Sequence, residues 1–406
     1  MATKAFLGIW FMLVVIHHVH AQLGCTDPQA NNFDPLATLN DGSCQYSPSN
    51  YSPILIQNLA PSIVENSGLI VWNNFIWTIN DSGSLPEIFK LDLLGNVIDT
   101  ILVANATNVD WEALTQSNTD LYIGDFGNNA GNRTDLSIYQ ISKQALISGQ
   151  SSTIQAQKRV FKYSDQMAFN LPVNGHSFDA EAFYFQNDSL VLFSKNWNDL
   201  YTKRYRFPAF WNDTLIISPL DSMFVDGLIT DVSIDTASNR VFALGYKNNG
   251  SNFYTSFIYL FFDFNESSVF SGNKRRIEIG NMLNLSQTEG LALKDSTSGF
   301  ISSEKIVSVI TIDPKLFSFD FSSFFTNAAG IDELEIDKLD FYPNPTMDYI
   351  LIDKEYLGCA LWLKDMQGTI VKYIPKIEEL KISLADINPG VYVLNLNNKC
   401  LKLVKI

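Results

Sequence analysis

The sequence predicts an all-β protein in which a β-propeller is followed by a small antiparallel β-sandwich. From Ile54 to about residue 325, short apolar and aromatic runs alternate with Asn, Gly, Asp and Ser, and no long segment has helical periodicity. The same region contains a degenerate internal repeat, which is typical of propellers. Residues 339–406 alternate apolar and polar side chains between Gly and Pro turns, as a small sandwich requires.

Residues 1–21 have the features of a secretory signal peptide. Lys4 precedes an unbroken apolar run from Ala5 to Ile16, and Ala21 ends a small-residue site, so cleavage is expected before Gln22. The apolar run is too short for a permanent membrane span, and no later stretch is long enough for one. Export through the periplasm to the cell surface or the medium is therefore expected.

The composition excludes several classes of partner and site. A formal net charge of −15 and a pI of about 4.6 argue against nucleic acid and anionic membranes as partners. The longest basic cluster, residues 274–276, is interpreted as a solvated loop. Mature protein would keep His176 as its one histidine, which excludes the usual zinc sites and any other site that requires two histidines.

Residues 22–46 form a small acidic module that Cys25 and Cys44 bracket. Two cysteines so placed in an exported chain predict a disulfide that closes a short loop. The segment resembles a module that recurs in secreted proteins of Bacteroidetes, although Asn31 stands where the usual form has a further cysteine. Its acidic and amide side chains can supply oxygens to calcium, but ordinary Asx turns are the favoured interpretation; they are Asp27, Asp34, Asn40 and Asp41. Residues 47–53 are predicted to be a linker.

The internal repeat spans the predicted propeller, residues 54–326. Each segment opens with a polar residue before a small or apolar one and reaches a second strand with a polar end. The openings are separated by 45, 69, 50 and 58 residues and fall at Ser67, Glu112, Glu181, Asp231 and Glu289. A four-stranded blade requires about 40–50 residues. We therefore expect six blades, with residues 253–280 in a blade that lacks the opening; five or seven blades are the alternatives.

The repeat also predicts a site, because the innermost strands of a propeller surround one channel. Glu112, Glu181, Asp231 and Glu289 are expected to converge there. Asp110 and Asp179 precede two of them by two positions and so point the same way, and Asp125 ends an adjoining strand. Oxygen ligands without histidine or cysteine favour Ca²⁺ as the cofactor. The alternative is that the carboxylates cap turns or line a wet channel without a metal.

The acidic strand openings, together with the Asn-Asp-Ser-Gly and Gly-Asp-x-Gly-Asn-Asn strand ends, resemble calcium-dependent six-bladed propellers of the phytase-like, paraoxonase-like and gluconolactonase-like groups. The resemblance implies a hydrolase of phosphate esters, esters or lactones. A non-catalytic surface propeller that binds a glycan, a protein or a small molecule is the alternative. Four tryptophans can stack on sugars, although core positions are the default for them; they are Trp72, Trp77, Trp111 and Trp197.

A predicted linker, residues 327–338, leads to the final block, which resembles the C-terminal sorting domain of type IX secretion cargo. The resemblance rests on four stretches: 341–345, 363–368, 387–392 and 402–406; their key residues are Tyr342, Pro343, Asn344, Pro345, Gly368, Gly390 and Tyr392. It implies that the type IX secretion machinery is a partner. Cys359 and Cys400 lie outside the family pattern, and both a disulfide and two separate thiols remain open.

Overall fold

The computed structural model describes residues 21–406 except 149–151, 251–252, 266, 308–310, 326–340, 342, 353, 367 and 397–398. The chain divides after Ala328 into two compact units, each of which is described by itself. The predicted signal peptide before Ala21 and the predicted linker at 327–338 lie outside the described residues. No described helix is long and apolar enough to cross a membrane.

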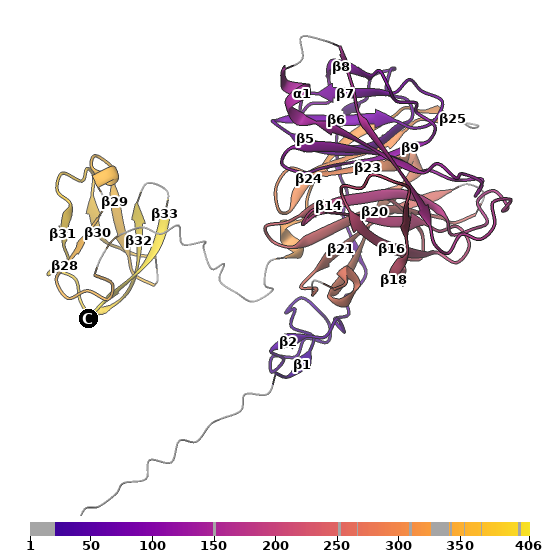
Figure 1. The fold of residues 1–406 in the computed structure, drawn as a ribbon. Coiled ribbons are helices and arrows are strands. Elements are labelled where there is room, and N and C mark those ends of the chain that lie inside the picture. The colour runs from indigo at the N-terminus through magenta and orange to yellow at the C-terminus, as the bar shows by residue number, and fades with distance from the viewer. Residues whose placement is uncertain are drawn as a thin grey trace, which may run out of the picture. The chain divides into compact units, whose positions relative to one another are not determined.

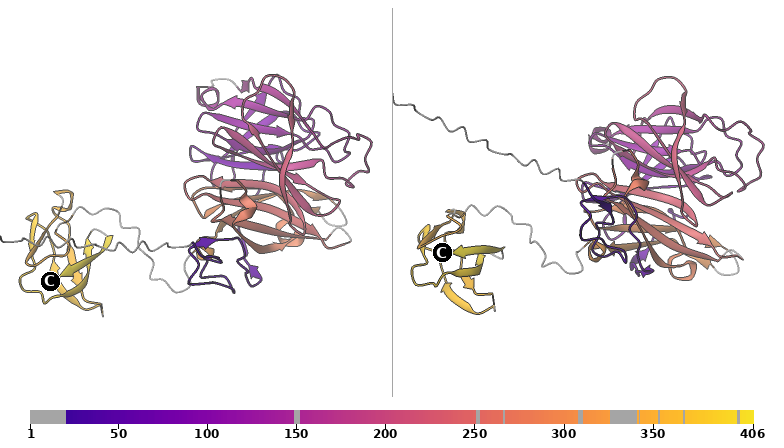
Figure 2. Two further views of the ribbon diagram at one scale, coloured as in Figure 1. Left: turned by 60° about the horizontal axis from the view of Figure 1, so that its bottom comes forward. Right: turned by 90° about the horizontal axis from the view of Figure 1, so that it is seen from below.

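The first unit is all-β, and its described residues form five sheets that are the blades of a propeller (Figures 1 and 2). Each innermost strand contacts the innermost strand of the next blade, and the fifth contacts the first, so the ring is complete. These innermost strands are β5 (Asn66–Trp72), β9 (Trp111–Gln116), β14 (Asp179–Gln186), β19 (Leu228–Asp235) and β23 (Gln287–Leu293).

The outer strands complete each blade in turn. The first blade continues through β6 (Phe75–Asn80), β7 (Glu87–Leu91), β8 (Val97–Val103) and β12 (Thr153–Ile154). The second contains β10 (Asp120–Asp125), β11 (Ser137–Ser142), β13 (Gln157–Tyr163) and β17 (Leu215–Ile217). The third contains β15 (Ser189–Lys195), β16 (Tyr201–Pro208) and β18 (Pro219–Phe224).

The fourth blade contains β20 (Arg240–Asn248), β21 (Tyr254–Phe262), β22 (Asn273–Asn281) and β3 (Ser49–Asn50). The fifth contains β24 (Ser298–Glu304), β27 (Lys315–Asp320) and β4 (Ile54–Asn58). Short elements lie between the strands: α1 (Lys143–Ser148), α2 (Met282–Leu285), and the paired strands β25 (Ile306–Val307) and β26 (Thr311–Ile312).

The blade count corrects the expectation of six in favour of the alternative of five. Residues 253–280 do not form a blade of their own, because β21 pairs with β20 and β22 pairs with β21 inside the fourth blade. The widest gap in the repeat, between Glu112 and Glu181, holds the short helix α1 and a long connection from β13 to β14 rather than an extra sheet. Outer strands carry no repeat signature, so the sequence alone did not assign them to a blade.

The propeller closes through a strand from the beginning of the domain. Strand β4 pairs antiparallel with β27, the third strand of the fifth blade. Strand β3 pairs parallel with β22 and extends the fourth blade. The predicted linker at 47–53 is therefore partly a blade strand, and the segment that contains it ties the start of the domain to its last two blades.

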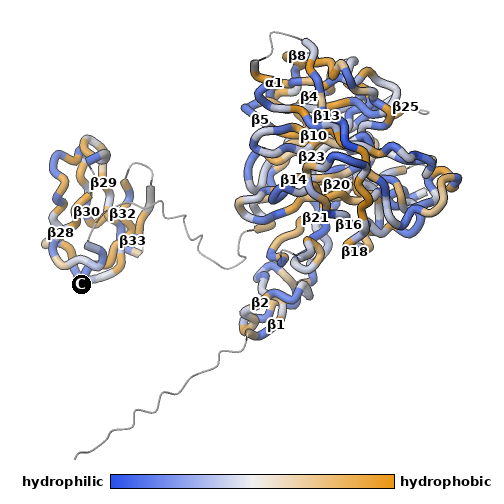
Figure 3. The backbone as a smooth tube through the Cα atoms, in the orientation of Figure 1, coloured by the Kyte–Doolittle hydropathy of each residue, from blue (hydrophilic) through white to orange (hydrophobic). Residues whose placement is uncertain are grey.

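Aromatic side chains fill the space between the second and third blades. Many of the connecting turns are hydrophilic (Figure 3). The ring of Phe126 in the second blade lies edge-on to Phe183 in the third, with centroids 5.2 Å apart. Trp77 and Trp111 are buried in the cluster between the first two blades, which confirms the core position expected of them. Trp72 packs against that cluster and tilts against Trp77.

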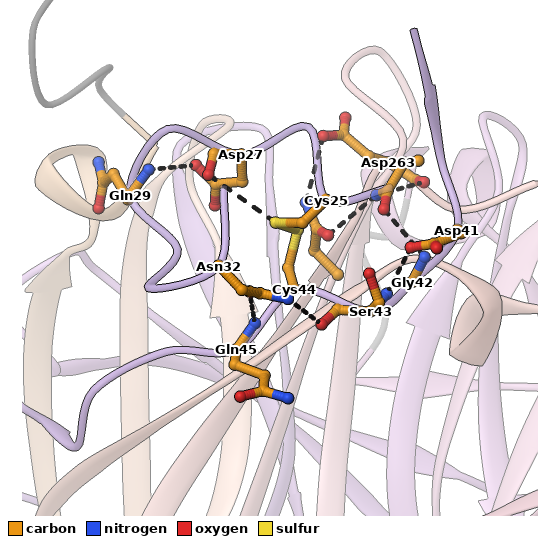
Figure 4. The surroundings of a disulfide bond; sticks show 12 residues. Cys25, Asp27, Gln29, Asn32, Asp41, Gly42, Ser43, Cys44, Gln45 and Asp263 are labelled. Carbon is orange, nitrogen blue, oxygen red and sulfur yellow. Dashed lines mark hydrogen bonds between the residues drawn. A yellow bond between two sulfur atoms is a disulfide. The ribbon is translucent and has the colours of Figure 1, made fainter. Parts of the chain in front are cut away.

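The N-terminal module contains the predicted disulfide between Cys25 and Cys44, and its two short strands are β1 (Leu23–Gly24) and β2 (Leu39–Asn40) (Figure 4). Each candidate calcium ligand instead accepts a backbone N–H two positions further on, at 2.9 Å; the acceptors are Asp27, Asp34, Asn40 and Asp41. These are Asx turns, so the structure supports the interpretation that the sequence favoured.

The basic cluster at 274–276 is not a solvated loop, which corrects that interpretation. It lies in β22 and anchors the module to the fourth blade. The Lys274 ammonium donates to the carbonyl oxygen of Gly42 at 3.0 Å, and the Arg275 guanidinium lies 5.1 Å from the centre of the Tyr46 ring and donates to Gln29. Carbonyl oxygens and an aromatic face both attract cations, so the cluster acts as a docking surface.

The second unit consists of a four-stranded sheet and a two-stranded sheet. The larger sheet contains β30 (Ile370–Ile374), β29 (Leu361–Lys364), β32 (Gly390–Leu396) and β33 (Lys399–Lys405), and the smaller pairs β28 (Tyr349–Leu351) with β31 (Lys381–Ser383). Tyr392, Leu394 and Leu396 are buried in one core, as their alternation predicts. Cys359 is a free cysteine, and the side chain of Cys400 lies outside the described part of the chain.

The sorting-motif residues close turns and edges of this unit. The Asn344 side chain accepts from the backbone N–H of Val404 at 2.8 Å and donates to the carbonyl oxygen of Lys402 at 2.9 Å, beside Pro343 and Pro345. The Tyr392 hydroxyl donates to the carbonyl oxygen of Asn388, just before β32 begins at Gly390, and Gly368 adopts a positive φ of 86°. Tyr342 lies outside the described residues.

Replacing Cys25 and Cys44 together by serine should destabilise the first unit. The bridge closes a loop of 19 positions, for which loop-closure entropy predicts about 3 kcal/mol. The thermal midpoint under non-reducing conditions should therefore fall in the double variant. Cys359→Ser, which changes a free thiol in the other unit, is the matched control. Equal midpoints for the wild type and the double variant would contradict a stabilising role for the bridge.

Candidate functional site

A cavity of about 250 Å³ lies at one end of the propeller channel, and its wall is rich in carboxylates. Most of this wall comes from the first residues of the inner strands and the last residues of the second strands. These residues lie side by side because the two strands of each pair are antiparallel. The acidic residues that line the cavity are Asp81, Glu112, Glu181, Glu289 and Glu304, and Lys195 is the cation among them. Of the four acids expected to converge, Glu112, Glu181 and Glu289 do so.

A β-bulge in every inner strand explains how these glutamates are aimed. In each blade one inner-strand residue is skipped by the pairing with the second strand; these residues are Gly68, Glu112, Glu181, Thr230 and Glu289. A bulge leaves its extra residue unpaired and redirects the side chain. Five equivalent bulges therefore point toward the same end of the channel, and three of them carry a glutamate.

Asp231 is not part of this cavity, because the repeat alignment was one residue out of register in the fourth blade. Its bulge residue is Thr230, and a shift of one residue in a strand turns a side chain to the other face. The Asp231 carboxylate is fully buried and accepts the backbone N–H groups of Leu291 at 2.6 Å, Val232 at 2.7 Å and Leu69 at 3.4 Å. It thus holds inner strands of the first, fourth and fifth blades together.

Three carboxylates at the cavity form a compact group, of which Asp81 and Glu112 line the cavity and Asp110 lies behind them. One ligand oxygen from each of Asp81, Asp110 and Glu112 lies within 4.8 Å of the other two. Gly127 packs directly against two of them, since a Cβ there would collide with Oε1 of Glu112 and Oδ2 of Asp110. Oε1 of Glu112 is buried and has no hydrogen-bond partner in the described part of the chain. We call Asp81, Asp110 and Glu112 the carboxylate trio.

Burial and mutual repulsion raise the pKa values of the trio. Burial, followed by the neighbouring charge of Asp110, raises the pKa of Asp81 to about 8. Burial and then the charges of Asp81 and Glu181 raise the pKa of Glu112 well above its ordinary value. The pKa of Asp110 is also raised by burial, while a hydrogen bond from the Asp81 carboxyl opposes that rise. Near neutral pH the trio therefore holds at least one proton that a cation would displace.

Another part of the cavity wall is partly neutralised by the buried Lys195. Its ammonium pairs with the Glu181 carboxylate and lies 5.3 Å from the centre of the Trp197 ring and 5.4 Å from that of Tyr246. Burial opposes the charged form, but the carboxylate of Glu181 and other neighbours raise the pKa of Lys195 well above its usual range. Glu289 accepts from the Gln287 amide at 2.7 Å on this wall. Trp197 is thus the one of the four tryptophans that lines the cavity.

Two predicted ligands position the site instead of lining it. Asp125 forms an ion pair with Arg133 at 2.9 Å and accepts the backbone N–H of Asp110 at 3.1 Å. Asp179 is fully buried and accepts the backbone N–H of Asn128 at 2.7 Å and the indole N–H of Trp197 at 3.3 Å. Both carboxylates fix loops at the cavity, and neither belongs to the carboxylate trio.

His176 also stabilises the rim. The backbone N–H of Phe178 donates to its Nδ1 at 3.1 Å, so Nε2 carries the hydrogen that is donated to the carbonyl oxygen of Asn129 at 3.1 Å. Asn129 lines the cavity, whereas His176 does not. The residues that the sequence did not select as ligands are Asp81, Glu304 and Lys195. Asp81 and Glu304 were nevertheless expected at the ends of strands that adjoin the predicted site, and this strand-end position was the signal for them.

The comparison with known families concerns the second unit. Residues 340–406 match the family model described as a secretion system C-terminal sorting domain. These residues are a type IX sorting domain. The protein is therefore exported to the cell surface or secreted, and the disulfide fits an extracytoplasmic location. No curated protein matches the sequence.

Several solved structures are similar to this chain at low identity. PorZ of Porphyromonas gingivalis, described as an essential surface component of the type IX secretion system, is 13% identical; the match has a TM-score of 0.26 and covers 84% of this chain and 51% of PorZ. This chain thus spans about half the length of PorZ. An exo-β-1,3-galactanase from Clostridium thermocellum is 10% identical, with a TM-score of 0.42 and coverage of 87% and 82%.

An α-L-arabinofuranosidase from Podospora anserina is 9% identical; the match has a TM-score of 0.39 and covers 68% of this chain and 97% of that enzyme. With identities below 25% and TM-scores below 0.5, these similarities assign no activity to this chain.

The raised pKa values predict an unusual pH dependence of stability in EDTA. Below about pH 8 the folded protein keeps a proton on Asp81 that an unfolded chain releases near its ordinary pKa of 3.8. Because the folded state binds more protons, the free energy of unfolding should fall as the pH rises from 5 to 8. Asp81→Asn should reduce this slope, and Asp188→Asn, which changes an exposed carboxylate, should not. A thermal midpoint that rises over this range would contradict the prediction.

Proposed function

We propose that the exported propeller binds a divalent cation, Ca²⁺ by the nature of its donors, at the carboxylate trio. The observation that carries this proposal is the trio itself, whose three ligand oxygens lie within 4.8 Å of one another. Carboxylate oxygens without histidine or cysteine suit calcium better than zinc or iron. The orphaned Oε1 of Glu112 and the glycine at position 127 fit an ion held close to the backbone.

Some residues would bind such an ion directly, and others would position its ligands. Asp81, Asp110 and Glu112 would hold it, while Asp125 keeps the backbone of Asp110 in place. Lys195 pairs with Glu181 in the same cavity, so the charge of Glu181 is already neutralised, whereas no ion pair engages the trio in the described part of the chain. A cation at the trio would relieve the repulsion that raises these pKa values.

Calcium should raise the thermal midpoint of the wild-type protein, because a ligand that binds only the folded state stabilises it by about 2.7 kcal/mol at a concentration of 100 Kd. Glu112→Gln keeps the shape of the side chain, removes a ligand charge and should abolish most of the shift. Glu304→Gln removes the same charge from the same cavity outside the trio, so most of the shift should remain.

Differential scanning fluorimetry in EDTA and in millimolar CaCl₂ measures the shift for each protein. A wild-type midpoint that calcium leaves unchanged would overturn the cation site. Equal losses in Glu112→Gln and Glu304→Gln would show that general charge in the cavity, and not ligation by the trio, attracts the ion.

Hydrolysis of phosphate esters, esters or lactones is the second candidate function, and the pairing of Asp81 with Asp110 favours it. Asp81, with a pKa of about 8, keeps its proton at neutral pH beside a second carboxyl group, which places an acid next to a base. This acid belongs to the cation-free site, because a cation at the trio would displace the proton of Asp81. Turnover of p-nitrophenyl phosphate, p-nitrophenyl acetate or simple lactones that Asp81→Asn loses would support it. Cation binding without turnover favours a non-catalytic surface propeller.

A further inference from the structure

A second and larger cavity, of about 630 Å³, lies at the other end of the inner strands. All five blades contribute to it through the residues with which β5, β9, β14, β19 and β23 end. Its volume is within the range of small-molecule and cofactor sites. It has no lining residue in common with the acidic cavity.

Asp231 separates the two cavities. Its carboxylate binds the backbone N–H groups of Leu69 and Leu291, and Leu69 already lines the larger cavity. Two positions before each of these leucines, Ser67 and Glu289 line the acidic cavity. A molecule in the larger cavity therefore does not reach the carboxylate trio, and its binding can be tested independently of the proposed cation.

The larger cavity offers almost no free charge. Lys143 and Asp188 are the charged residues that line it. The Lys143 ammonium is already engaged, because it donates at 2.7 Å to the side chain of Gln116 and at 2.7 Å to the carbonyl oxygen of Ser117, and it lies 5.0 Å from the centre of the Trp72 ring. Only Asp188, exposed at the rim, remains. An uncharged ligand therefore fits this cavity better than an ion.

Two side-chain amides at the rim are held in place by their turns. Asn187 and Asp188 form the two-residue turn between β14 and β15, both with positive φ, which is a rigid hairpin geometry. Asn118 lies in the turn after β9, where the Ser117 hydroxyl accepts the backbone N–H of Asp120 at 2.9 Å. In the described part of the chain no hydrogen bond engages the side-chain amide of Asn118 or of Asn187. Amides both donate and accept, as sugar hydroxyls do.

An aromatic wall continues from the cavity into a neighbouring hollow of about 370 Å³. Phe185 lines both spaces and stacks on Tyr122, with ring centroids 5.7 Å apart and planes 10° apart. Phe210, which is 62% exposed, lines the far side of the second hollow. The two hollows share Asn118 and Asp188 as well, so together they can receive an elongated molecule.

We propose that this end of the propeller is a binding site for a neutral oligosaccharide. A sugar chain has apolar C–H faces that pack on aromatic rings, and hydroxyl rims that exchange hydrogen bonds with amides. Phe185 and Phe210 supply such surfaces, and Asn118 and Asn187 supply such amides. The charged residues that line the joined hollows are the engaged Lys143 and the acids Asp120 and Asp188, so anionic polymers would be repelled, and two adjoining hollows favour a chain over a single sugar. The site does not depend on the proposed cation.

The test uses the full exported chain and a panel of neutral hexasaccharides: cello-, xylo-, manno-, malto- and galacto-oligosaccharides. Isothermal titration in EDTA should show binding of at least one of them. Asn118→Ala and Asn187→Gly should each weaken that binding about three- to tenfold, as expected for the loss of one or two hydrogen bonds. Glycine at 187 keeps the positive φ of the turn.

Two matched variants separate this site from general effects. Asn74→Gly makes the same change in the hairpin between β5 and β6, where φ is also positive and the side chain lines neither hollow; its affinity should equal that of the wild type. Glu112→Gln, in the acidic cavity, should also leave the affinity unchanged. The proposal is overturned if no oligosaccharide of the panel binds, or if Asn74→Gly or Glu112→Gln weakens binding as much as the rim variants.

Discussion

The five inner strands have to lie side by side around one axis without sharing a hydrogen-bond ladder, and the rest of the structure depends on how this constraint is met. An unpaired backbone group in a buried place costs about as much as a lost hydrogen bond. The hydroxyls of Ser67 and Thr230 therefore donate to the carbonyl oxygens of Glu112 and Thr288 in neighbouring blades. The Asp231 carboxylate accepts backbone N–H groups from three inner strands at once. The hydrogen bonds of these side chains take the place of the missing ladder, and a cavity remains at each end of the inner strands.

The same constraint produces the acidic cavity. A bulge at one position of each inner strand bends the strand toward its neighbour and releases one side chain from the pleat. Where that residue is Gly68, the absence of a Cβ lets β5 approach the backbone of Leu114. Where it is Glu112, Glu181 or Glu289, the carboxylate turns into the channel. Close packing of the ring and convergence of the acids are thus two effects of one backbone irregularity, which accounts for the unusual density of buried negative charge.

The sequence predicted the all-β class, the disulfide, the sorting domain and three of the converging glutamates, because each has a local signature. It did not predict the number of blades, since the outer strands β21 and β22 have no repeat signature and their membership is decided by pairing. Asp231 was misplaced because a bulge shifts the side-chain alternation by one residue, and a repeat alignment cannot locate a bulge. The Lys195–Glu181 pair joins two strands, and the Asp81–Asp110 contact joins the residue after β6 to the residue before β9, so spacing alone could not reveal them.

The pairing of strand β4 with β27 also implies an order in which the propeller folds. This strand is made early, yet its partner β27 is the last strand of the ring to be synthesised. Until then the fifth blade lacks its third strand, and β4, its outer strand, has no partner. A contact between the two ends of a domain makes ring closure late and cooperative. The propeller is therefore completed only when nearly all of its sequence is available to the export route. A truncation just before β27 would leave an unpaired strand edge that is prone to aggregation.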